Sequence, residues 1–386
     1  MPENSLKPEQ LLKLRDTIDS LDHRIIEALA ERQRVVRQVI SSKITTATQV
    51  RDLDREDALL KKIRDKAVQA GLDPYFAEQL FREIIFQSVR YQNHSLVDHQ
   101  NELNTVKTIH VAYQGLEGAY SHLAALRHYR ERYEEVICHG FQTIEEVTNA
   151  VENDEVQVGV LPIENTTAGS INDTYDLLGS KSLFIVGEEV FRVEHCLLTL
   201  EPVAFENIRR IISHPLTLVQ CSKFLAGFKH TTIESFIDSA MSAQKVKFDA
   251  DLSQAAIASP EAAEKYGLHI LQHEISNNPD NFTRYVVIGK QKVAVDSQLP
   301  SKTSLILSTI HEKGALMRCL QVLDKYEINM SKLESRPRPD KAFQYQFYVD
   351  IEANDQDPKV LKALKELEGK AANLRVLGCY PKQVEE

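Results

Sequence analysis

Two cations interrupt an apolar stripe in the first part of the chain. Arg32 lies between Ala28 and Val35 at heptad spacing, and Lys43, eleven residues later, falls about 20° around the same helix face. Charged side chains are rarely buried unless they are paired or hold a ligand. The same region carries Arg15, the i,i+4 pair Asp52 and Glu56 with Arg55 between them, and the i,i+4 pair Ser88 and Gln92. Together these residues favour a polar site between helices over the alternative, a coiled coil with surface ion pairs.

Four segments in the middle of the chain carry small polar side chains where a strand meets a turn or a helix. They are 115–121 (GLEGAYS), 164–169 (ENTTAG), 213–221 (SHPLTLVQC) and 281–285 (NFTRY). The first is G-x-x-G, and G-x-G occurs nowhere in the chain, which disfavours a nicotinamide-binding loop.

The third of these segments also offers two nucleophiles. Cys221 with His214 as its base would make a reactive thiol, but a lone cysteine on a helix is more often a buried thiol. Ser213 and His214 are adjacent in the sequence, which rarely gives the geometry of a catalytic triad.

Two short segments near the C-terminus lie at the ends of strands. Gly314-Ala315-Leu316 begins a helix, and Glu334-Ser335-Arg336-Pro337 ends the next strand. Each alone is compatible with a loop glycine or a polar turn.

The first part of the chain is predicted to be helical. No glycine occurs before Gly71 and no proline between Pro8 and Pro74. Helices are expected at about 8–43, 51–70 and 74–92, with Gly71 ending the second and Asp73-Pro74 capping the third. The apolar stripe of the first helix is too long to be covered by two short helices, so it requires a partner chain.

After a polar connector at 93–107, short β runs alternate with helices. Strands are expected at 109–113, 157–162, 183–186, 254–259 and 285–289, and helices at 144–152, 171–178, 218–228, 239–248 and 260–266. This alternation predicts an α/β fold of one domain or two lobes around a cleft. A second connector covers 291–300, and the remaining residues have the order β-α-β-β-α-β.

The sequence therefore predicts a multidomain chain. Its parts are an all-α domain at 1–95, a linker at 96–107, a two-lobed α/β domain at 108–290 and an α+β ferredoxin-like domain at 301–381. The chain has 386 residues and a formal net charge of −10, which disfavours nucleic acid as a partner. Its five scattered cysteines predict neither a disulfide framework nor a zinc site. No membrane-length apolar run or signal peptide is evident, so a cytoplasmic location is expected.

The first hundred residues resemble the all-helical chorismate mutases, whose long first helix is shared in an intertwined dimer. That family places two arginines and a lysine on the long helix, then D-x-x-R-E, then a serine and a glutamine, and this chain matches at each place. The resemblance implies rearrangement of chorismate to prephenate, which needs a compact substrate and stabilised charge on the ether oxygen. It also implies roles: Arg32 and Arg55 on the carboxylates, Arg15 from the partner chain, Lys43 and Gln92 at the ether oxygen, Asp52 and Glu56 at the ring hydroxyl, and Ser88 as a further substrate contact.

Residues 109–289 resemble the prephenate dehydratases, which carry G-x-x-G-x-Y-S, E-N-[ST]-x-x-G, S-H-P-x-x-x-x-Q-C and T-R-[FY]. Minor departures are Ala119, His122, Thr217 and Tyr285. The resemblance implies that Thr283 helps hydroxide leave as water while carbon dioxide departs and the ring becomes aromatic. It further implies substrate contacts by Ser121, Asn165, Thr166, Ser213 and Gln220, with Arg284 at the side-chain carboxylate.

The last eighty residues resemble ACT regulatory domains, and G-A-L and E-S-R-P match the subset that senses phenylalanine, with Met317 in place of a common valine. The resemblance implies L-phenylalanine at Gly314–Leu316 and Glu334–Pro337, and feedback inhibition through a coupling free energy between two sites.

The whole chain thus resembles the bifunctional chorismate mutase–prephenate dehydratases of phenylalanine biosynthesis. The expectation is an enzyme without cofactor or metal, with chorismate and prephenate as substrates, in a homodimer or higher homo-oligomer. A non-catalytic amino-acid-binding regulator on a decayed scaffold is one rival, against which Lys43, Gln92 and Thr283 argue. A mutase joined to a dehydrogenase is another, disfavoured by the lack of G-x-G.

Overall fold

A computed structural model describes residues 8–46, 53–101, 107–297, 299–310, 312–338 and 344–383. The chain divides into two compact units, one of residues up to Leu96 with the last three residues, and one of Val97–Gln383.

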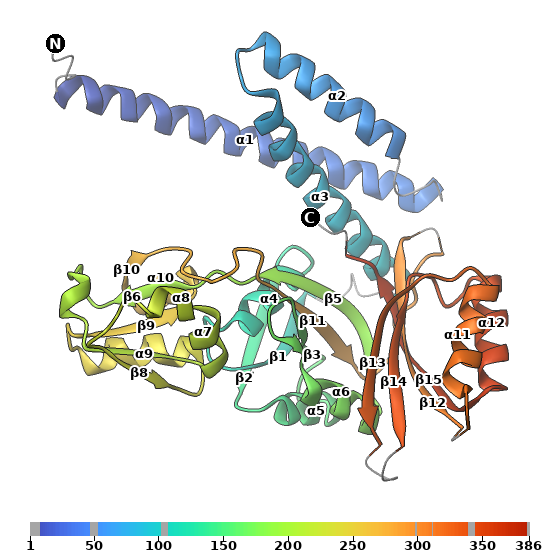
Figure 1. Ribbon diagram of the computed structural model, residues 1–386. Coiled ribbons are helices and arrows are strands. Elements are labelled where there is room, and N and C mark those ends of the chain that lie inside the picture. Colours follow the sequence, from blue (N-terminus) through green and yellow to red (C-terminus); the bar gives the residue numbers. More distant parts are fainter. Residues whose placement is uncertain are drawn as a thin grey trace. The chain divides into compact units, whose positions relative to one another are not determined.

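Three helices build the first unit, as predicted (Figure 1). They are α1 (Pro8–Thr46), α2 (Leu53–Gln69) and α3 (Pro74–Gln100). The chain turns after α2 at Gly71, whose φ of +71° is a left-handed conformation that favours glycine. Asp73 accepts a hydrogen bond from the Tyr75 amide at 3.0 Å and so caps α3. In the described part of the chain, no helix combines the length and the hydropathy that a membrane span requires.

The predicted connector at 93–107 is partly wrong, because α3 continues to Gln100. The last residues of α3, from Val97 on, belong to the second unit. Val97 and Asp98 are buried, and Asp98 accepts two hydrogen bonds from the guanidinium of Arg132, at 2.5 and 3.0 Å. A polar sequence without a clear period thus remains helical because tertiary contacts stabilise it.

The second unit contains two sheets that combine parallel and antiparallel strands, and a third sheet near the C-terminus. The first sheet has the order β2-β1-β3-β11-β5, with the short β4 paired to β3. β1 is parallel to β2 and β3, and β11 is antiparallel to β3 and β5. Its elements are β1 (Thr108–Gln114), α4 (Tyr120–Tyr129), β2 (Glu135–Phe141), α5 (Ile144–Glu152), β3 (Val158–Asn165), β4 (Gly169–Ser170), α6 (Asn172–Ser180), β5 (Phe184–Arg192) and β11 (Phe282–Gly289).

The second sheet is inserted between β5 and β11 and has the order β10-β6-β9-β7-β8. The chain crosses between the sheets twice, after β5 and before β11 (Figure 1). Its elements are β6 (Cys196–Thr199), β7 (Arg210–Ser213), α7 (Pro215–Gln220), α8 (Ser222–Leu225), β8 (Thr232–Ser235), α9 (Ser239–Asp249), β9 (Gln254–Ala258), α10 (Pro260–Tyr266) and β10 (His269–Gln272).

The C-terminal residues form a four-stranded antiparallel sheet in the order β13-β14-β12-β15. The elements follow the predicted sequence: β12 (Ser301–Thr309), α11 (Ala315–Lys325), β13 (Met330–Pro337), β14 (Tyr345–Ile351), α12 (Pro358–Glu368) and β15 (Ala371–Pro381). Figure 1 shows α11 and α12 on one face of this sheet, where they bury a cluster that includes Cys319, Val349 and Val360.

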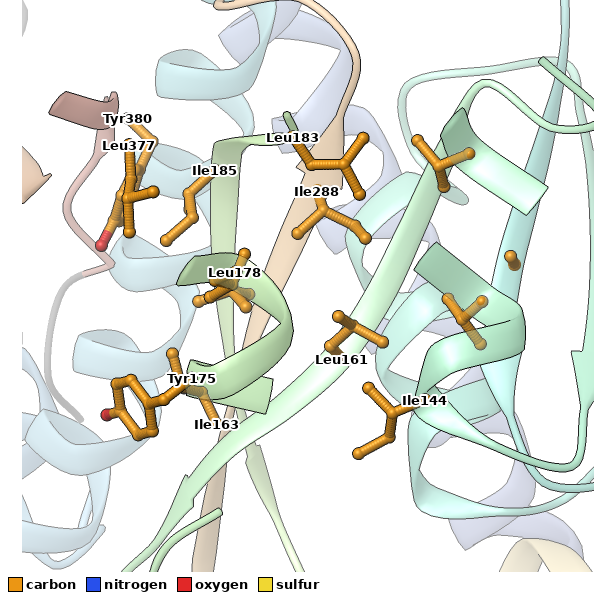
Figure 2. Packing of buried hydrophobic residues seen from close by; sticks show 14 of the residues in the cluster. Ile144, Leu161, Ile163, Tyr175, Leu178, Leu183, Ile185, Ile288, Leu377 and Tyr380 are labelled. Carbon is orange, nitrogen blue, oxygen red and sulfur yellow. The ribbon is translucent and has the colours of Figure 1, made fainter. Parts of the chain in front are cut away.

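The other face of the C-terminal sheet packs on the first sheet of the α/β region. Leu377 and Tyr380 of β15 belong to the same buried cluster as Leu183 and Ile185 at β5 (Figure 2). At Gly378 the two backbones approach so closely that an added Cβ would collide with the Ile185 carbonyl oxygen. The shared core shows that the C-terminal sheet is an integral part of this unit, in contact with the strands that carry the predicted dehydratase motifs.

Candidate active sites

In the helical unit, α1 and α3 bring three of the predicted residues onto facing surfaces. The Arg32 guanidinium donates to Ser88 Oγ at 2.5 Å, and Ser88 donates to the Ile84 carbonyl oxygen at 2.7 Å. Gln92 follows one turn later on α3 and is buried. Burial lowers the pKa of Arg32 from its ordinary value. A half-buried cation held by a neutral hydroxyl retains charge to offer to an anionic ligand.

The remaining residues of this set are not all gathered by one chain. Arg15 is exposed, and it precedes Arg32 by 17 positions on one continuous helix. At a rise of about 1.5 Å per residue the two are roughly 25 Å apart along the helix axis, so they cannot share one site within the chain. Arg55 is exposed and Glu56 half-buried, and both have interaction partners. The Lys43 side chain and Asp52 lie outside the described residues.

In the α/β region, all four predicted motifs contribute to one cavity of about 720 Å³. It lies where the carboxyl ends of β1, β2 and β3 meet the start of α7 and α9, a usual place for a ligand in open α/β sheets. Ser121, Asn165, Gln220 and Thr283 line it, one from each motif, and each is less than one-tenth exposed. These are four of the seven residues predicted for the dehydratase site.

The centre of this cavity is the pair Asn165 and Thr283, which are register partners on β3 and β11. The Asn165 amide nitrogen donates to Thr283 Oγ1 at 2.9 Å. Asn165 Oδ1 accepts from the backbone amides of Thr167 and Ala168 at 3.0 and 2.9 Å, which fixes the orientation of the amide. Thr283 Oγ1 accepts this bond, and the threonine keeps one hydrogen that it can donate to the neighbouring Tyr285 phenol or to a ligand.

A chain of polar groups continues from Asn165 to the second sheet. The Gln220 amide nitrogen donates to Asn165 Oδ1 at 3.2 Å, and Gln220 Oε1 lies 2.8 Å from His195 Nε2. His195 Nδ1 lies 2.9 Å from the Tyr120 hydroxyl. Burial lowers the pKa of His195, opposed by the hydrogen bond with Gln220. His195 lines the cavity but was not predicted, because a lone histidine beside a short strand carries no motif signal.

Tyr285, noted above only as a departure from phenylalanine, also lines the cavity. Its phenol has hydrogen bonds with the hydroxyls of Ser121 and Thr283. Burial raises the pKa of Tyr285, so the group is a neutral phenol at physiological pH. Thr283 is therefore surrounded by neutral hydrogen-bonding groups.

Two predicted substrate contacts need correction. Ser213 is fully buried beneath the cavity, where its hydroxyl donates to the Ile257 carbonyl oxygen at 2.6 Å. Thr166 is exposed, and its hydroxyl accepts from the Phe282 amide at 3.0 Å and donates to the Asp280 carbonyl oxygen. Neither lines the cavity. Both hydroxyls hold backbone segments together instead.

Arg284 is the larger correction. Successive side chains on a strand point to opposite faces, so Thr283 and Tyr285 face the cavity while Arg284 faces away. Its guanidinium donates to Glu188 at 2.9 Å, to Asp350 at 2.7 Å and to the Tyr380 hydroxyl at 2.9 Å. Burial alone would lower the pKa of Arg284, but these neighbours raise it well above its ordinary value. The expected contact with a substrate carboxylate does not fit this position.

Neither of the two suggested nucleophiles is in an environment that would activate it. Cys221 is fully buried, and burial raises the pKa of its thiol to about 12, so the thiol is protonated at neutral pH. The Ser213 hydrogen is directed to a backbone carbonyl rather than to His214. The buried-thiol interpretation of Cys221 is therefore confirmed.

Among the described residues that line the cavity, none is a lysine or an arginine. The helix α4 begins there with Ala119 at its N-cap, which has no side-chain capping bond. The first amides of α4 are thus without the usual capping oxygen, and a helix N-terminus of this kind attracts anions.

The predicted effector residues lie at the start of α11 and at the end of β13. Gly314, with φ of +76°, precedes Ala315 and Leu316 at the start of α11. Glu334, Ser335, Arg336 and Pro337 end the edge strand β13. Glu334 accepts a hydrogen bond from Ser170, and Arg336 forms two hydrogen bonds with Asp176 at 2.7 and 3.0 Å. Part of the second segment therefore holds β13 against β4 and α6.

A helical unit with a half-buried cation on one face and an α/β unit with a polar cavity are consistent with a two-site enzyme. The family model for chorismate mutase type II matches residues 14–93, and the model for prephenate dehydratase matches residues 111–293. The bifunctional chorismate mutase/prephenate dehydratase of Escherichia coli K12 is 37% identical over 97% of this chain and 96% of its own length. The protein of the same description from Aquifex aeolicus is 33% identical over 97% and 98%.

Solved structures agree for the second unit. A prephenate dehydratase from Staphylococcus aureus matches with a TM-score of 0.61 at 25% identity, over 70% of this chain and all of that one. A protein described as GqqA, a quorum quenching acylase, matches with 0.64 at 31% identity, over 70% and 97%. The prephenate dehydratase of Arthrobacter aurescens, solved in complex with L-Phe, matches with 0.65 at 24% identity, over 71% and 90%. The chain belongs to the family of bifunctional chorismate mutase/prephenate dehydratases, and its two domains carry these two activities.

Proposed function

We propose that Thr283 donates a hydrogen bond to the ring hydroxyl of prephenate as that group leaves. Expulsion of carbon dioxide supplies the electron pair that makes the ring aromatic, and the departing hydroxide needs a donor. The observation that carries this role is the 2.9 Å hydrogen bond from Asn165 to Thr283 Oγ1, since Thr283 is the acceptor there and can turn its own hydrogen from Tyr285 to the substrate. The neutral, buried surroundings strengthen such a bond.

The carboxylates of prephenate would then bind to dipoles rather than to cations. The first amides of α4, beside Ala119, are the candidates, with Ser121 as an additional donor. Arg284 is not part of this proposal, because its guanidinium is bound on the other face of β11.

The test for the dehydratase site is Thr283→Ala with Thr283→Ser as its matched control, using purified protein, prephenate and no added cofactor. We expect Thr283→Ala to lose about a hundred- to a thousandfold in kcat, Thr283→Ser to retain most of it, and both to keep parental mutase activity. Formation of phenylpyruvate by Thr283→Ala at the parental rate would remove Thr283 from the reaction.

For the mutase we propose that the α1 and α3 face binds the compact form of chorismate. Arg32 and Arg55 would bind carboxylates, Lys43 and Gln92 the ether oxygen, and Asp52 with Glu56 the ring-hydroxyl side. The half-buried Arg32 held by Ser88 supports this assignment. Lys43→Ala is expected to abolish the conversion of chorismate to prephenate and to leave the conversion of added prephenate intact. Near-normal mutase turnover would refute the assignment.

We further propose that the mutase works as a homodimer in which the partner supplies Arg15. Leu11, Leu14, Ile18, Leu21 and Ile25 repeat along α1 and are between 43% and 56% exposed. A second copy of this helix is a suitable cover for such a stripe, because identical heptad surfaces pack against each other.

The C-terminal domain is proposed to be an ACT-type sensor of L-phenylalanine, which would make the enzyme subject to feedback in phenylalanine biosynthesis. Its split β-α-β order and the Phe-bound relative from Arthrobacter aurescens support this proposal. Titration with L-phenylalanine, with D-phenylalanine as the control, is expected to lower the dehydratase rate only for the L form. A flat response to both would count against the sensor. We also propose a cytoplasmic location, in keeping with five cysteines that are all free thiols.

A further inference from the structure

The catalytic pair has a second pair directly beside it in the same ladder. Thr283 faces Asn165 across β11 and β3, and the next residues, Arg284 and Glu164, are also register partners. Because side chains alternate along a strand, the first pair points into the cavity and the second to the opposite face of the sheet. The reverse side of the catalytic ladder therefore carries one cation and one carboxylate.

Both members of this reverse pair are held by the C-terminal sheet. Lys332 Nζ of β13 lies 2.6 Å from Glu164 Oε1. Arg284 Nη1 lies 2.7 Å from Asp350 Oδ2 of β14. The side chains of Arg284, Asp350 and Lys332 are all less than one-fifth exposed and that of Glu164 is 34% exposed, so water screens the Arg284 pair poorly and the Glu164 pair more strongly.

Additional bonds restrict the Arg284 end further. Glu188 of β5 accepts from Arg284 Nε at 2.9 Å and from Lys302 Nζ at 3.0 Å. Asp350 accepts a second hydrogen bond, from Ser304 at 2.5 Å. The charges balance, with two cations and two carboxylates, so each group is held in place by its neighbours.

We propose that Arg284 and Glu164 are positioning residues, through which the C-terminal sheet sets the distance between Asn165 and Thr283 on the other face. The inference rests on the proposed role of Thr283. A hydrogen bond at the reacting group tolerates displacements of only about 0.5 Å before catalysis suffers. A shift of β13 or β14 would move β3 and β11, and with them the donor of the leaving group.

The same arrangement gives the sensor a physical route to the cavity. Lys332, Glu334 and Arg336 alternate along β13 and all contact the dehydratase region, at Glu164, Ser170 and Asp176 respectively. A ligand that binds to the segment 334–337 would alter the strand that holds Glu164. Inhibitor binding and catalysis would thus both depend on the two neighbouring register pairs of β3 and β11.

The test uses Lys332→Gln and Asp350→Asn, which change the C-terminal partners and leave the cavity untouched. We expect each to lower the dehydratase kcat by about tenfold with KM for prephenate within about twofold, and mutase activity to stay parental. The matched control is Lys325→Gln, which removes a salt bridge of the same 2.6 Å length, to Glu366, on the helix-covered face of the C-terminal sheet. The control should leave kcat unchanged.

Charge reversal separates positioning from general destabilisation. The double variant Lys332→Glu with Glu164→Lys should recover most of the kcat lost by Lys332→Glu alone, since the pair is restored with opposite signs. Arg284→Lys is expected to keep more kcat than Arg284→Gln, with KM little changed in both.

The inference is overturned if Lys332→Gln and Asp350→Asn behave like the control, or if Arg284→Lys raises KM at constant kcat, as loss of a substrate contact would. These results are distinct from failure of the underlying function. Thr283→Ala at the parental rate would remove the Thr283 role whatever the interface variants do, whereas a dead Thr283→Ala with silent interface variants would refute the positioning alone.

Discussion

The proposed sites of the two units are built from opposite kinds of residue. The helical unit uses charged groups such as Arg32, set on long helices whose apolar stripe is exposed in the single chain. Among the residues that the structure describes, the lining of the α/β cavity includes no cation; Asp173 and Asp238 are its carboxylates, and the proposed catalytic pair, Asn165 and Thr283, is neutral. One proposed site thus relies on cations and on a second copy of the chain, and the other relies on neutral groups of a single chain.

The chemistry explains the difference. A pericyclic rearrangement has no proton transfer, so the enzyme can act only by holding the diacid and stabilising charge at the ether oxygen, for which fixed cations are effective. Loss of hydroxide from prephenate requires a hydrogen at one oxygen, which a correctly oriented hydroxyl supplies. Burying cations beside that hydroxyl would cost desolvation energy without supplying the hydrogen.

The strongest test of this difference is to prevent two copies of the chain from pairing through α1. Ile18→Lys combined with Ile25→Lys places charges on the exposed stripe of α1, which should prevent pairing of two copies. We expect mutase activity to fall by about a hundredfold or more, because Arg15 of the other copy is lost, and dehydratase activity to stay within about twofold. Sedimentation and the two initial rates measure this.

Phe248→Lys is the control for that experiment, because Phe248 is 88% exposed on α9 and lies outside the stripe. It should change neither activity nor the oligomeric state. A monomeric Ile18→Lys, Ile25→Lys variant with full mutase activity would show that one chain completes the site alone.

The second prediction concerns Asn165, the neutral partner. Asn165→Asp keeps the shape but replaces the amide donor by an acceptor, so Thr283 would donate to the carboxylate instead of to the substrate. We expect the dehydratase kcat to fall by about a hundredfold with the mutase unaffected. Thr166→Val is the control one residue along; since Thr166 does not line the cavity, its kcat should remain within a few fold of the parent. Equal losses in both variants would contradict the assigned positions.

The motifs place Asn165 at the end of β3 and Thr283 at the start of β11, and the structure brings the two together as register partners. Ser213 also ends a strand, β7, yet its hydroxyl is turned to a backbone carbonyl, so a polar residue at a strand end is not by itself a contact. The assignments failed where a motif residue was treated as a contact without its face being checked. Alternation along β11 puts the side chains of Arg284 and Thr283 on opposite faces of the sheet. The sequence around Arg284 gives no sign that its face is covered by the C-terminal sheet, which contributes Asp350.

Other features escaped prediction because their signals are short. β6, β7, β8 and β10 have four residues each, too few for a period of two to be recognised. His195 enters the cavity from the crossover before β6, with no motif around it. The end of α3 at Gln100 depends on the contact between Asp98 and Arg132, which is a tertiary effect. By contrast, α1, α2 and the capped α5 and α10 were predicted to within a few residues.

The third prediction concerns the charged site and is smaller. Ser88→Ala removes one hydrogen-bond acceptor of Arg32 and leaves the cation in place. We expect mutase KM for chorismate to change by about two- to tenfold, the range of a single hydrogen bond, with kcat less affected. Steady-state kinetics of chorismate consumption provide the measurement. A loss as large as that of Lys43→Ala would mean that Ser88 itself takes part in the chemistry.

The smallest effect is a dependence of dehydratase stability on pH. Burial lowers the pKa of His195 below its ordinary value of 6.5. As the pH falls below that value, the unfolded chain takes up a proton that the folded cavity resists, so the free energy of unfolding decreases; above it the contribution does not vary. His122 and His214, also near the cavity and with pKa values lowered by burial, act in the same direction.

His195→Asn removes only one of these three groups, so it should flatten the decline in the urea midpoint of dehydratase inactivation between about pH 6.5 and 5 without abolishing it. The groups that face His195, Tyr120 and Gln220, are uncharged in this range and add no slope of their own. Mutase inactivation, measured in the same samples, should have the same pH profile in parent and variant. Identical slopes for dehydratase inactivation in parent and variant would mean that His195 is as easily protonated in the folded cavity as in the unfolded chain. The cavity would then be open to water around His195, unlike the buried site that the comparison assumes.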